Sequence, residues 1–550
     1  MLKQEIENLI EKITSKKAII ETPDNFSYGD FSTNVAIKEK LNAQEIAQKL
    51  SNNPLFTKVE VVNGFINFFL KPEYFLKNLK QILKQKEKYG QSQTGKGQTI
   101  VIDYSGPNIA KPFGIGHLRS TIIGQAIYNL YKFLGYKVVG DNHLGDWGTQ
   151  FGKLIYKIEL GIKNQELRIK DLTINDLEKL YVEFHKEAEK EPALNDEARA
   201  WFKKLEQGDK KATEIWQACK EISLKEFNKV YNLLGVKIDN TLGESFYQDK
   251  MQSVFEEMKS RGLTKQSEGA WVVEFINNEL PSLVLIKSDG ATTYFLRDLA
   301  TIKYRLKKWK PSIIAYEVGV DQSLYFKQLF ATVKMLGWTK NEKLVHISHG
   351  LMRSKTGKFS TRRGDTVHLE DVLQEAIDKA GELSKEKSKE LADQVGIGAV
   401  KYNDLSQHHS RDIVFDWEKI LNLKGNSGPY LQYAFARSQS VLEKANYSPT
   451  SAKIGKVNFS ELQEIEKTLL KKLLRFSEIV EQSAKSFSPN LICNYIFDLA
   501  QSFNLFYNEV SILKADTKAQ KEFRLALTFG VGQVIKNGLT LLGIESPNKM

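Results

Sequence analysis

Binding of phosphate groups is the first function that the residues of this chain suggest. His117 directly follows a glycine-rich turn, Gly114-Ile115-Gly116, and stands at the start of a segment with helical spacing. The first backbone N–H groups of a helix lack partners within the helix, and the helix dipole makes this end positive. A histidine placed there can donate to a phosphate held by those N–H groups. Taken alone, a histidine at a helix start is more often structural, so the surrounding elements decide.

These surrounding elements read as a strand, a helix and a second strand. The β-branched run Ile100-Val101-Ile102 predicts a buried strand. Apolar residues from Ile123 to Leu134 follow the i, i+3, i+4 spacing of an amphipathic helix, and Gly135 ends it. Residues 136–140 predict the next strand. A loop rich in Gly and Pro between a strand and a helix is typical of a βαβ nucleotide site.

A second segment with chemistry to offer is Gly357-Lys358-Phe359-Ser360-Thr361-Arg362. A loop that carries cations between small residues can close over a leaving pyrophosphate and offset its negative charge. By itself such a run is equally a solvated surface loop.

Composition sets limits on the class of protein. The 550 residues suffice for roughly three to five domains. Hydrophobic residues make up 41% and charged residues 27%, as in soluble globular proteins. The formal charge, 79 minus 67, is +12, which suits a polyanionic partner or simply a basic enzyme surface.

Targeting and metal signals are missing from the sequence. Cys219 and Cys493 lie far apart without a CxxC or Cys/His cluster, so neither a disulfide framework nor a zinc site is indicated. The N-terminal segment lacks the apolar core of a signal peptide, and no apolar run reaches about 18 residues. We therefore expect a cytoplasmic protein that does not enter membranes and has no metal ligand set of its own.

Three parts follow one another along the chain. The first is α+β, with a hairpin signal at Asn63-Gly64; the second is an α/β, doubly wound parallel-sheet (Rossmann-like) domain; the third is an all-α bundle. After a helical insertion, strands of the parallel sheet are expected to resume at residues 283–286, 313–316 and 344–347. The expected bounds are 1–92, 93–420 with the insertion at about 160–235, and 421–550.

At this point the sequence resembles a known family. Gly114-Ile115-Gly116-His117 is similar to the His-Ile-Gly-His signature of class I aminoacyl-tRNA synthetases. The long flanks, residues 105–112 and 145–152, narrow the resemblance to arginyl-tRNA synthetases. The segment 357–362 resembles the second signature, Lys-Met-Ser-Lys-Ser. The chain departs from these patterns at Gly114, which replaces the first His and removes a phosphate donor, and at Thr361, which replaces the second Lys and removes a positive charge.

The resemblance implies an arginine–tRNA ligase of class I fold. Such an enzyme activates arginine with ATP and Mg²⁺ and transfers it to the 3′-terminal adenosine of tRNA(Arg). The family adds an N-terminal domain that contacts the tRNA elbow and a helical anticodon-binding domain, places stem contacts in the region corresponding to about 350–420, and is usually monomeric. The alternatives are a class I enzyme for another amino acid and a tRNA-binding paralogue that has lost catalysis, the latter suggested by Gly114.

The resemblance also implies roles for individual residues. In the family, Lys111 is thought to compensate for the missing second lysine, the acids Asp103 and Asp298 read the guanidinium, and Asn108 and Gln322 hold the other end of arginine. Tyr325 receives no role, because the family often has a histidine there. The catalytic residues implied are His117, Lys111 and Lys358; the ATP-binding residues are Gly114, Gly116, His117, His143, His349, Met352, Lys358 and Ser360; the arginine-binding residues are Asp103, Asn108, His143, Tyr294, Asp298 and Gln322; the tRNA-binding residues are Tyr507 and Arg437.

Overall fold

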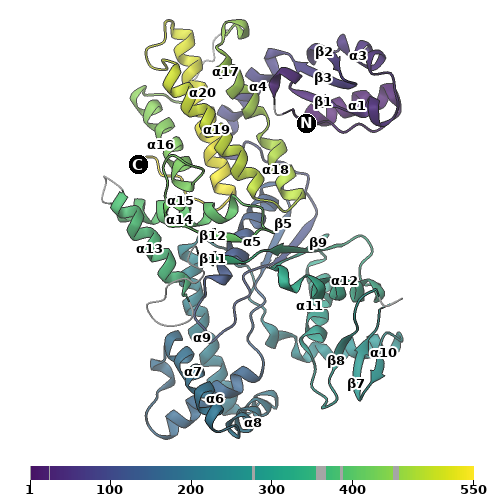
Figure 1. The fold of residues 1–550 in the computed structure, drawn as a ribbon, viewed down its shortest axis with the longest axis vertical. Coiled ribbons are helices and arrows are strands. Elements are labelled where there is room, and N and C mark those ends of the chain that lie inside the picture. The colour runs from purple at the N-terminus through teal and green to yellow at the C-terminus, as the bar shows by residue number, and fades with distance from the viewer. Residues whose placement is uncertain (1, 24, 276–278, 355–366, 384–387, 450–456) are drawn as a thin grey trace. The chain divides into compact units, whose positions relative to one another are not determined.

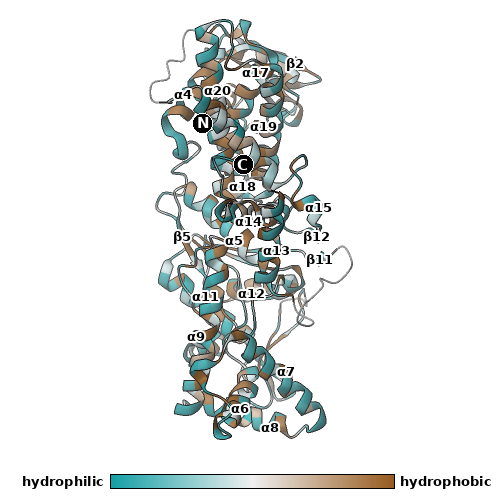
Figure 2. Cartoon of the chain, turned by 90° about the vertical axis from the view of Figure 1, so that its left-hand side faces the viewer, coloured by the Kyte–Doolittle hydropathy of each residue, from teal (hydrophilic) through white to brown (hydrophobic). Residues whose placement is uncertain are grey.

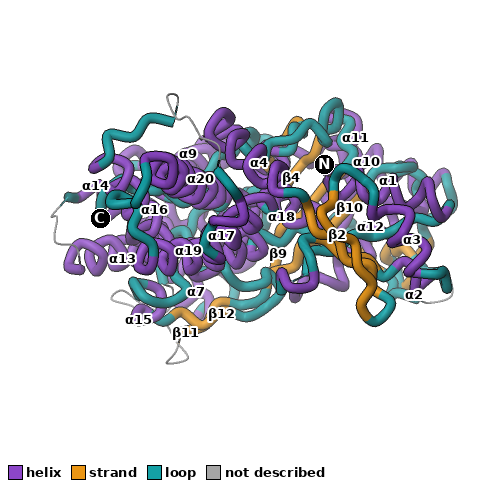
Figure 3. The backbone as a smooth tube through the Cα atoms, turned by 90° about the horizontal axis from the view of Figure 1, so that it is seen from above, coloured by secondary structure: helices purple, strands orange, loops and turns teal. Residues whose placement is uncertain are grey.

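The chain forms two compact units. The computed structural model describes residues 2–23, 25–275, 279–354, 367–383, 388–449 and 457–550. Unit 1 comprises Met1–Tyr89, Arg437–Ser477 and Asp498–Ile535, and unit 2 comprises Gly90–Ala436, Glu478–Phe497 and Lys536–Met550. Helices dominate the described residues, as the tube in Figure 3 shows. No helix of this described part is long and apolar enough to cross a membrane.

Unit 1 begins with a small antiparallel sheet in the order β1-β3-β2 (Figure 1). The predicted hairpin is present: Asn63 and Gly64 join β2 to β3 with φ of 50° and 82°, the left-handed backbone that an Asn-Gly turn supplies. The elements here are α1 (Leu2–Thr14), η1 (Phe26–Tyr28), β1 (Phe31–Thr33), α2 (Val35–Lys38), α3 (Ala43–Ser51), β2 (Phe56–Val62), β3 (Phe65–Leu70), α4 (Pro72–Gln85) and η2 (Lys86–Lys88).

The C-terminal part of the chain is helical, as predicted. Its elements are α16 (Gly428–Lys444), η7 (Phe459–Glu461), α17 (Glu464–Leu474), α18 (Phe476–Lys485), α19 (Asn490–Glu509) and α20 (Lys518–Leu541). Within unit 1, Arg524 on α20 donates to the buried Glu466 carboxylate on α17 at 2.8 Å. Such a buried charge pair fixes the register of the two helices, because either charge alone would be costly to bury.

Unit 2 is built on a parallel sheet in the order β10-β9-β4-β5. One half runs β4 (Thr99–Asp103), α5 (Gly116–Phe133), β5 (Lys137–Asp141), and the other runs β9 (Ile313–Gly319), α12 (Ser323–Met335), β10 (Lys343–His349). Strand β4 pairs in parallel with both β5 and β9, so the first half of the sheet extends to one side of β4 and the second half to the other, and the strand order reverses between β4 and β9. Ligands of doubly wound sheets bind at the carboxyl ends of the strands beside such a switch.

Helix α5 differs from the amphipathic helix that its sequence predicts. Nearly every residue from Leu118 to Tyr131 is buried, including polar Arg119, Thr121 and Gln125. The reason is tertiary: α5 contacts β4, β5 and β9 and also α14 (Lys389–Leu405), so little of its surface meets water.

The strand predicted at 283–286 forms, but not in the parallel sheet. Strand β8 (Leu283–Ile286) pairs antiparallel with β7 (Ala270–Val273), which pairs with β6 (Lys265–Ser267) in a separate sheet. Val284 is 39% exposed, whereas strands of a covered parallel sheet are buried on both faces. Helices α10 (Met251–Ser260) and α11 (Tyr294–Trp309) flank this sheet in the sequence, and η4 (Glu244–Lys250) precedes them.

The helical insertion is formed by four helices and a turn: α6 (Thr149–Lys163), η3 (Ile169–Asp171), α7 (Ile174–Lys190), α8 (Leu194–Glu206) and α9 (Lys210–Leu233). Hydrophilic colour dominates α7 and α8 in Figure 2, in keeping with their many charged residues. Phe184, Ala188 and Ala198 form the small apolar core that holds these helices together.

The chain after residues 355–366 is hydrogen-bonded to the first signature, and the chain before them pairs with a strand elsewhere in unit 2. Before them, β11 (Met352–Ser354) pairs in parallel with β12 (Ile413–Phe415). After them, Ile115 N–H donates to the Val367 carbonyl at 3.0 Å, and Leu369 N–H to the Phe113 carbonyl at 2.7 Å. Helices α13 (Leu369–Leu383), α14 and α15 (Trp417–Ile420) also belong to unit 2, and η6 (Val320–Gln322) lies between β9 and α12.

Candidate active site

A cavity of about 300 Å³ opens where β4, β9 and β10 end. Asp103 is the last residue of β4, Gly319 of β9 and His349 of β10, and all three line it. The first turn of α5 adds Gly116, His117 and Ser120. Six predicted site residues therefore share one cavity: Asp103, Gly116, His117, His143, Asp298 and His349.

His117 is placed to act as a neutral hydrogen-bond donor. Burial lowers the pKa of its imidazole, because a charged ring is poorly solvated there. Its Nδ1 atom is buried and has no hydrogen-bond partner among the described residues. The ring meets Phe113 edge-on at 5.3 Å between centroids, which holds it at the helix start. A ring atom without a partner beside the positive end of α5 suits a phosphate ligand.

His349 has the opposite electrostatic character. Burial disfavours its charged form, but the Glu317 carboxylate, 3.0 Å from its Nδ1 atom, raises the pKa of the imidazole overall. Glu317 on β9 is 1% exposed, so the pair is shielded from water. The cavity therefore combines a neutral histidine on α5 with a histidine that favours its cationic form at the end of β10.

Asp103 already has a guanidinium partner within the chain. Its Oδ2 atom lies 2.8 Å from Nη1 of Arg305, whose Nη2 atom lies 2.8 Å from Oδ2 of Asp141. Arg305 is completely buried and stacks its guanidinium over the Tyr316 ring at 5.2 Å. This arginine was not foreseen from the sequence. It stands seven residues after Asp298 on α11, and that two-turn spacing was the available signal.

Asp298 is held by two other side chains. The Tyr325 hydroxyl on α12 donates to its Oδ2 atom, and Nε2 of His143 lies 3.6 Å from its Oδ1 atom. Burial raises the pKa of the carboxyl, while His143 and Tyr325 act in the opposite direction. Tyr325, to which the family resemblance assigned no role, is thus in direct contact with a predicted site residue.

Several predicted residues are not among those that line the cavity. Tyr294 is 61% exposed, and its ring centroid lies 5.4 Å from that of Tyr325. Gln322 is exposed at the end of η6, and Met352 begins β11. Gly114 forms an isolated bridge with His368. The predicted residues Lys358 and Ser360, and Thr361 with them, lie outside the described residues.

Lys111 and Asn108 lie on the loop between β4 and α5. Lys111 is exposed, with its Nζ atom 4.9 Å from the centre of the Tyr181 ring on α7. Asn108 bridges to Gly145, and a Cβ atom added at Gly145 would stand 1.9 Å from Oδ1 of Asn108. Glycine is required at residue 145 because the asparagine amide occupies the space of a side chain.

The predicted tRNA-binding residues lie together in unit 1. The Arg437 guanidinium stands 4.8 Å from the centre of the Tyr507 ring and donates to Oδ1 of Asn504 at 2.6 Å. Tyr507 is 39% exposed, whereas Phe503 and Phe506 are fully buried. Of the aromatic residues on this stretch of α19, Tyr507 is the one that can reach a ligand.

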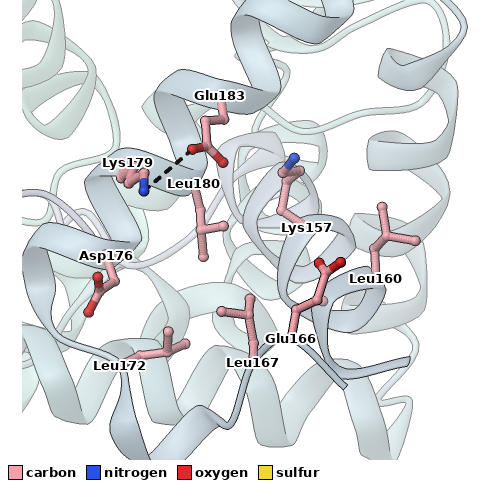
Figure 4. Close-up of a pocket in the computed structure, with 10 residues that line it drawn as sticks. Lys157, Leu160, Glu166, Leu167, Leu172, Asp176, Lys179, Leu180 and Glu183 are labelled. Atoms are coloured by element: carbon pink, nitrogen blue, oxygen red, sulfur yellow. Dashed lines mark ion pairs between the residues drawn. The ribbon is translucent and has the colours of Figure 1, made fainter. Parts of the chain in front are cut away.

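A second hollow, of about 230 Å³, lies in the helical insertion (Figure 4). Leucines from α6, α7 and the segment between them form part of its wall, and charged residues surround them. Those charges serve local structure: Lys179 pairs with Glu183, Lys157 pairs with Glu187, and Asp176 caps α7. None of the predicted site residues lines it, so the cavity at the sheet remains the candidate active site.

Comparisons with known proteins agree with this geometry. Family models match three parts of the chain: the arginyl tRNA synthetase N terminal domain over residues 1–70, the tRNA synthetases class I (R), catalytic domain over residues 78–417, and the DALR anticodon binding domain over residues 431–550. An arginine–tRNA ligase from Clostridium botulinum is 42% identical over 99% of this chain and 97% of its own. One from Clostridium beijerinckii is 40% identical over 100% and 98%.

Solved structures show the same likeness. The arginyl-tRNA synthetase of Plasmodium falciparum superposes with a TM-score of 0.83 at 26% identity, covering 100% of this chain and 99% of that one. The arginyl-tRNA synthetase of Thermus thermophilus, at 22% identity and a TM-score of 0.84 over the whole of both chains, supports the fold alone. The predicted fold class is confirmed, and the chain belongs to the family of class I arginyl-tRNA synthetases.

Proposed function

We propose that this protein joins arginine to tRNA(Arg) in two steps. The arginine carboxylate attacks the α-phosphorus of ATP, and the bond to the bridging oxygen breaks, which releases diphosphate and leaves arginyl-adenylate. A ribose hydroxyl of the terminal adenosine, the 2′-hydroxyl in class I enzymes, then accepts the arginyl group and AMP leaves. The observation that carries the proposal is that the Asp298 carboxylate and the His117 imidazole line one cavity at the switch of the parallel sheet.

Stabilisation of phosphate charge falls to residues at the helix start. A neutral His117 donates a hydrogen bond to the α-phosphate, where charge develops, and Gly116 lets the phosphates approach the N-terminus of α5. His349, which favours its cationic form, stands at the end of β10 and with Met352 frames the adenine. On this proposal Lys111, Gly114, Lys358 and Ser360 complete the ATP site. These groups act mainly by position and charge, as phosphoryl transfer requires.

Recognition of arginine depends on the acidic end of the cavity. We assign the substrate guanidinium to Asp298, whose partners Tyr325 and His143 leave it acceptor capacity. Asp103 contributes less attraction, because Arg305 already offsets its charge. Tyr294, whose ring lies beside that of Tyr325, extends the arginine site at the acidic end of the cavity. We assign Asn108, Gln322 and His143 to the α-amino and carboxylate groups of arginine.

Mg²⁺ enters this scheme with ATP. The described residues contain no group of three or more His, Cys, Asp or Glu side chains that could hold a metal ion by themselves. Oxygen ligands supplied by the substrate phosphates suit Mg²⁺, which keeps much of its water. When bound, the ion would neutralise phosphate charge.

The tRNA is assigned to the rest of the chain. We propose that residues 1–92 contact the tRNA elbow, that the region of about 350–420 contacts a stem of the tRNA, and that the helical residues 421–550 bind the anticodon through Tyr507 and Arg437. An exposed aromatic ring beside an arginine suits an unstacked base. The excess of 12 positive charges agrees with this partner. We further propose that the protein works as a cytoplasmic monomer.

An exchange assay tests the proposal directly. The resemblance implies that tRNA must be bound before arginine is activated, so the assay contains tRNA(Arg). Under these conditions radiolabelled diphosphate should pass into ATP only when arginine is also present, and arginyl-tRNA should form. Canavanine should support exchange more weakly than arginine, and citrulline, which lacks the positive charge, should not support it. A tRNA-binding paralogue without catalysis would bind tRNA(Arg) but give no exchange. Exchange with a different amino acid would indicate another class I specificity.

A further inference from the structure

We propose that Tyr325 is a positioning residue for arginine recognition: its hydroxyl fixes the Asp298 carboxylate so that the remaining oxygen lone pairs face the substrate guanidinium. The inference rests on the proposed function and adds a residue that the family resemblance had left without a role.

The contacts of Tyr325 hold its hydroxyl in one place. The hydroxyl donates to Oδ2 of Asp298. Its ring is only partly exposed and meets Phe295 edge-on at 5.8 Å and Phe326 at 5.7 Å. A phenol has few rotatable bonds, so a ring fixed by two neighbours presents its O–H group with little loss of entropy. The donor lies on α12 and the acceptor on α11, so the contact depends on how these two helices pack and not on residue spacing within one helix.

Asp103 and Asp298, the two acids of the cavity, differ in whether a basic side chain compensates their charge. The contact between Tyr325 and Asp298 is important because of this difference. Asp103 shares the buried Arg305 with Asp141, at 2.8 Å to each carboxylate. Asp298 has no lysine or arginine partner among the described residues; Arg297, its neighbour in sequence, pairs with Glu244 at 3.2 Å. Asp298 is therefore the carboxylate whose charge is left for a substrate cation. A side chain that fixes Asp298 controls the strongest attraction in the cavity.

A tyrosine suits this task better than a cation would. Burial and the nearby Asp298 carboxylate raise the pKa of Tyr325 well above its ordinary value, so the phenol stays protonated over any practical assay range. It donates a hydrogen bond without adding a positive charge that would repel the substrate guanidinium. A histidine at this position would add such a charge whenever it became protonated.

The pH dependence of Asp298 reflects all the groups around it. The ionisable groups that act on it, or on which it acts, are His143 after β5, Asp103 on β4, Tyr316 on β9, Glu244 in η4, Arg297 on its own helix and Tyr325 on α12. Loss of the Tyr325 hydrogen bond removes one of the influences that lower the pKa of Asp298. The ionised form that binds arginine should then require a higher pH.

The test compares Tyr325→Phe with Tyr304→Phe. Both substitutions remove one hydroxyl and keep the ring; Tyr304 lies on α11 among Phe246, Tyr247 and Trp309, away from the cavity lining. Tyr325→Phe should raise KM for arginine about 10- to 100-fold, the range for a hydrogen bond to a charged group. It should change kcat by less than about threefold and move the acidic limb of kcat/KM to higher pH. Tyr304→Phe should change none of these.

Tyr325→His supplies a second variant with a donor in the same position. It should recover part of the arginine affinity above about pH 7, where imidazole is neutral, and lose it again below about pH 6. An unchanged KM and pH profile in a folded Tyr325→Phe enzyme would overturn the inference, as would equal effects of the two Tyr→Phe changes. Absence of arginine-dependent exchange in the unmodified enzyme, measured with tRNA(Arg) present, would instead refute the proposed function, so the two failures can be told apart.

Discussion

Arg119, two residues after His117 on α5, forms a buried ion pair with Asp404 on α14. The Nε atom of Arg119 lies 3.0 Å from Oδ2 of Asp404, and each side chain is 1% exposed. Arg119 Nη1 also donates to the carbonyls of Gly350 and Arg411 at 2.8 and 2.7 Å, and Nη2 donates to the His409 carbonyl at 3.1 Å. One guanidinium thus joins the start of α5 to α14 and to the chain beside β11 and β12.

Asp404→Asn should weaken the folded protein severely. The substitution leaves a buried guanidinium without its counter-charge, which costs about 3 to 5 kcal/mol of unfolding free energy. Urea unfolding followed by fluorescence would measure the change. Glu274→Gln provides the control, because its pair with Lys265 is exposed and its loss should have no measurable effect. Equal stability of Asp404→Asn and the unmodified protein would contradict the structural role given to Arg119.

The pKa values of His117 and His349 should be shifted in opposite directions, although both side chains line the same cavity. Burial lowers the pKa of His117 below 6.5, and Glu317 raises that of His349 above it despite burial. Stability from His349 is therefore full below the unfolded pKa and is lost as pH rises through its folded pKa. Stability from neutral His117 is lost as pH falls below the unfolded pKa. NMR titration of the two imidazoles would check the order; identical pKa values would contradict it.

Asp298→Asn should impair arginine recognition while the fold persists. The amide keeps the shape of the side chain but loses the charge that pairs with guanidinium, so kcat/KM for arginine should fall by about 100-fold or more. Asp298→Ala should abolish arginine-dependent charging. KM for ATP should stay nearly constant in the Asn variant, since we assign the phosphates to the His117 end of the cavity. Charging at the normal rate by Asp298→Ala would show that Asp298 does not bind the substrate arginine.

Gly145→Ala should act through Asn108. The new methyl group would stand 1.9 Å from Oδ1 of Asn108, so the amide must leave its position. We expect KM for arginine to rise by about as much as in Asn108→Ala, and the double variant to lose nothing further. Gly381→Ala on α13, where the methyl group would lie 3.5 Å from Ala392, serves as the control and should be harmless. Additive losses in the double variant would show that the two residues act separately.

Tyr507→Ala should weaken tRNA binding alone. Stacking of one base on an aromatic ring contributes about 1 to 3 kcal/mol, so KM for tRNA(Arg) should rise roughly 5- to 100-fold. KM for arginine should not change, because Tyr507 lies in unit 1 and the cavity lies in unit 2. Tyr507→Phe keeps the stacking face and should behave almost like the unmodified enzyme. A normal KM for tRNA(Arg) in the Ala variant would show that the anticodon does not stack on Tyr507.

The sequence by itself determined the local elements and the chemistry at their ends. The strand 100–102, the hairpin at Asn63-Gly64 and the end of α5 at Gly135 follow from β-branched runs and from backbone conformations that glycine favours. His117 could be placed at a helix start because turn, helix and histidine are contiguous in the chain. Phosphate binding could therefore be predicted from the order of residues in this one segment.

Tertiary structure alone decided which elements and side chains contact one another. The separate sheet of β8, the nearly complete burial of α5 and the Asp103–Arg305–Asp141 cluster all join segments far apart in sequence. Tyr325 and Asp298 are 27 residues apart, and their contact depends on how α11 packs beside α12. Periodicity shows which face of a helix is apolar, but packing between elements chooses its neighbours. For that reason the family resemblance could name the two acids of the cavity, and only the fold could show that Arg305 compensates the charge of Asp103 and not that of Asp298.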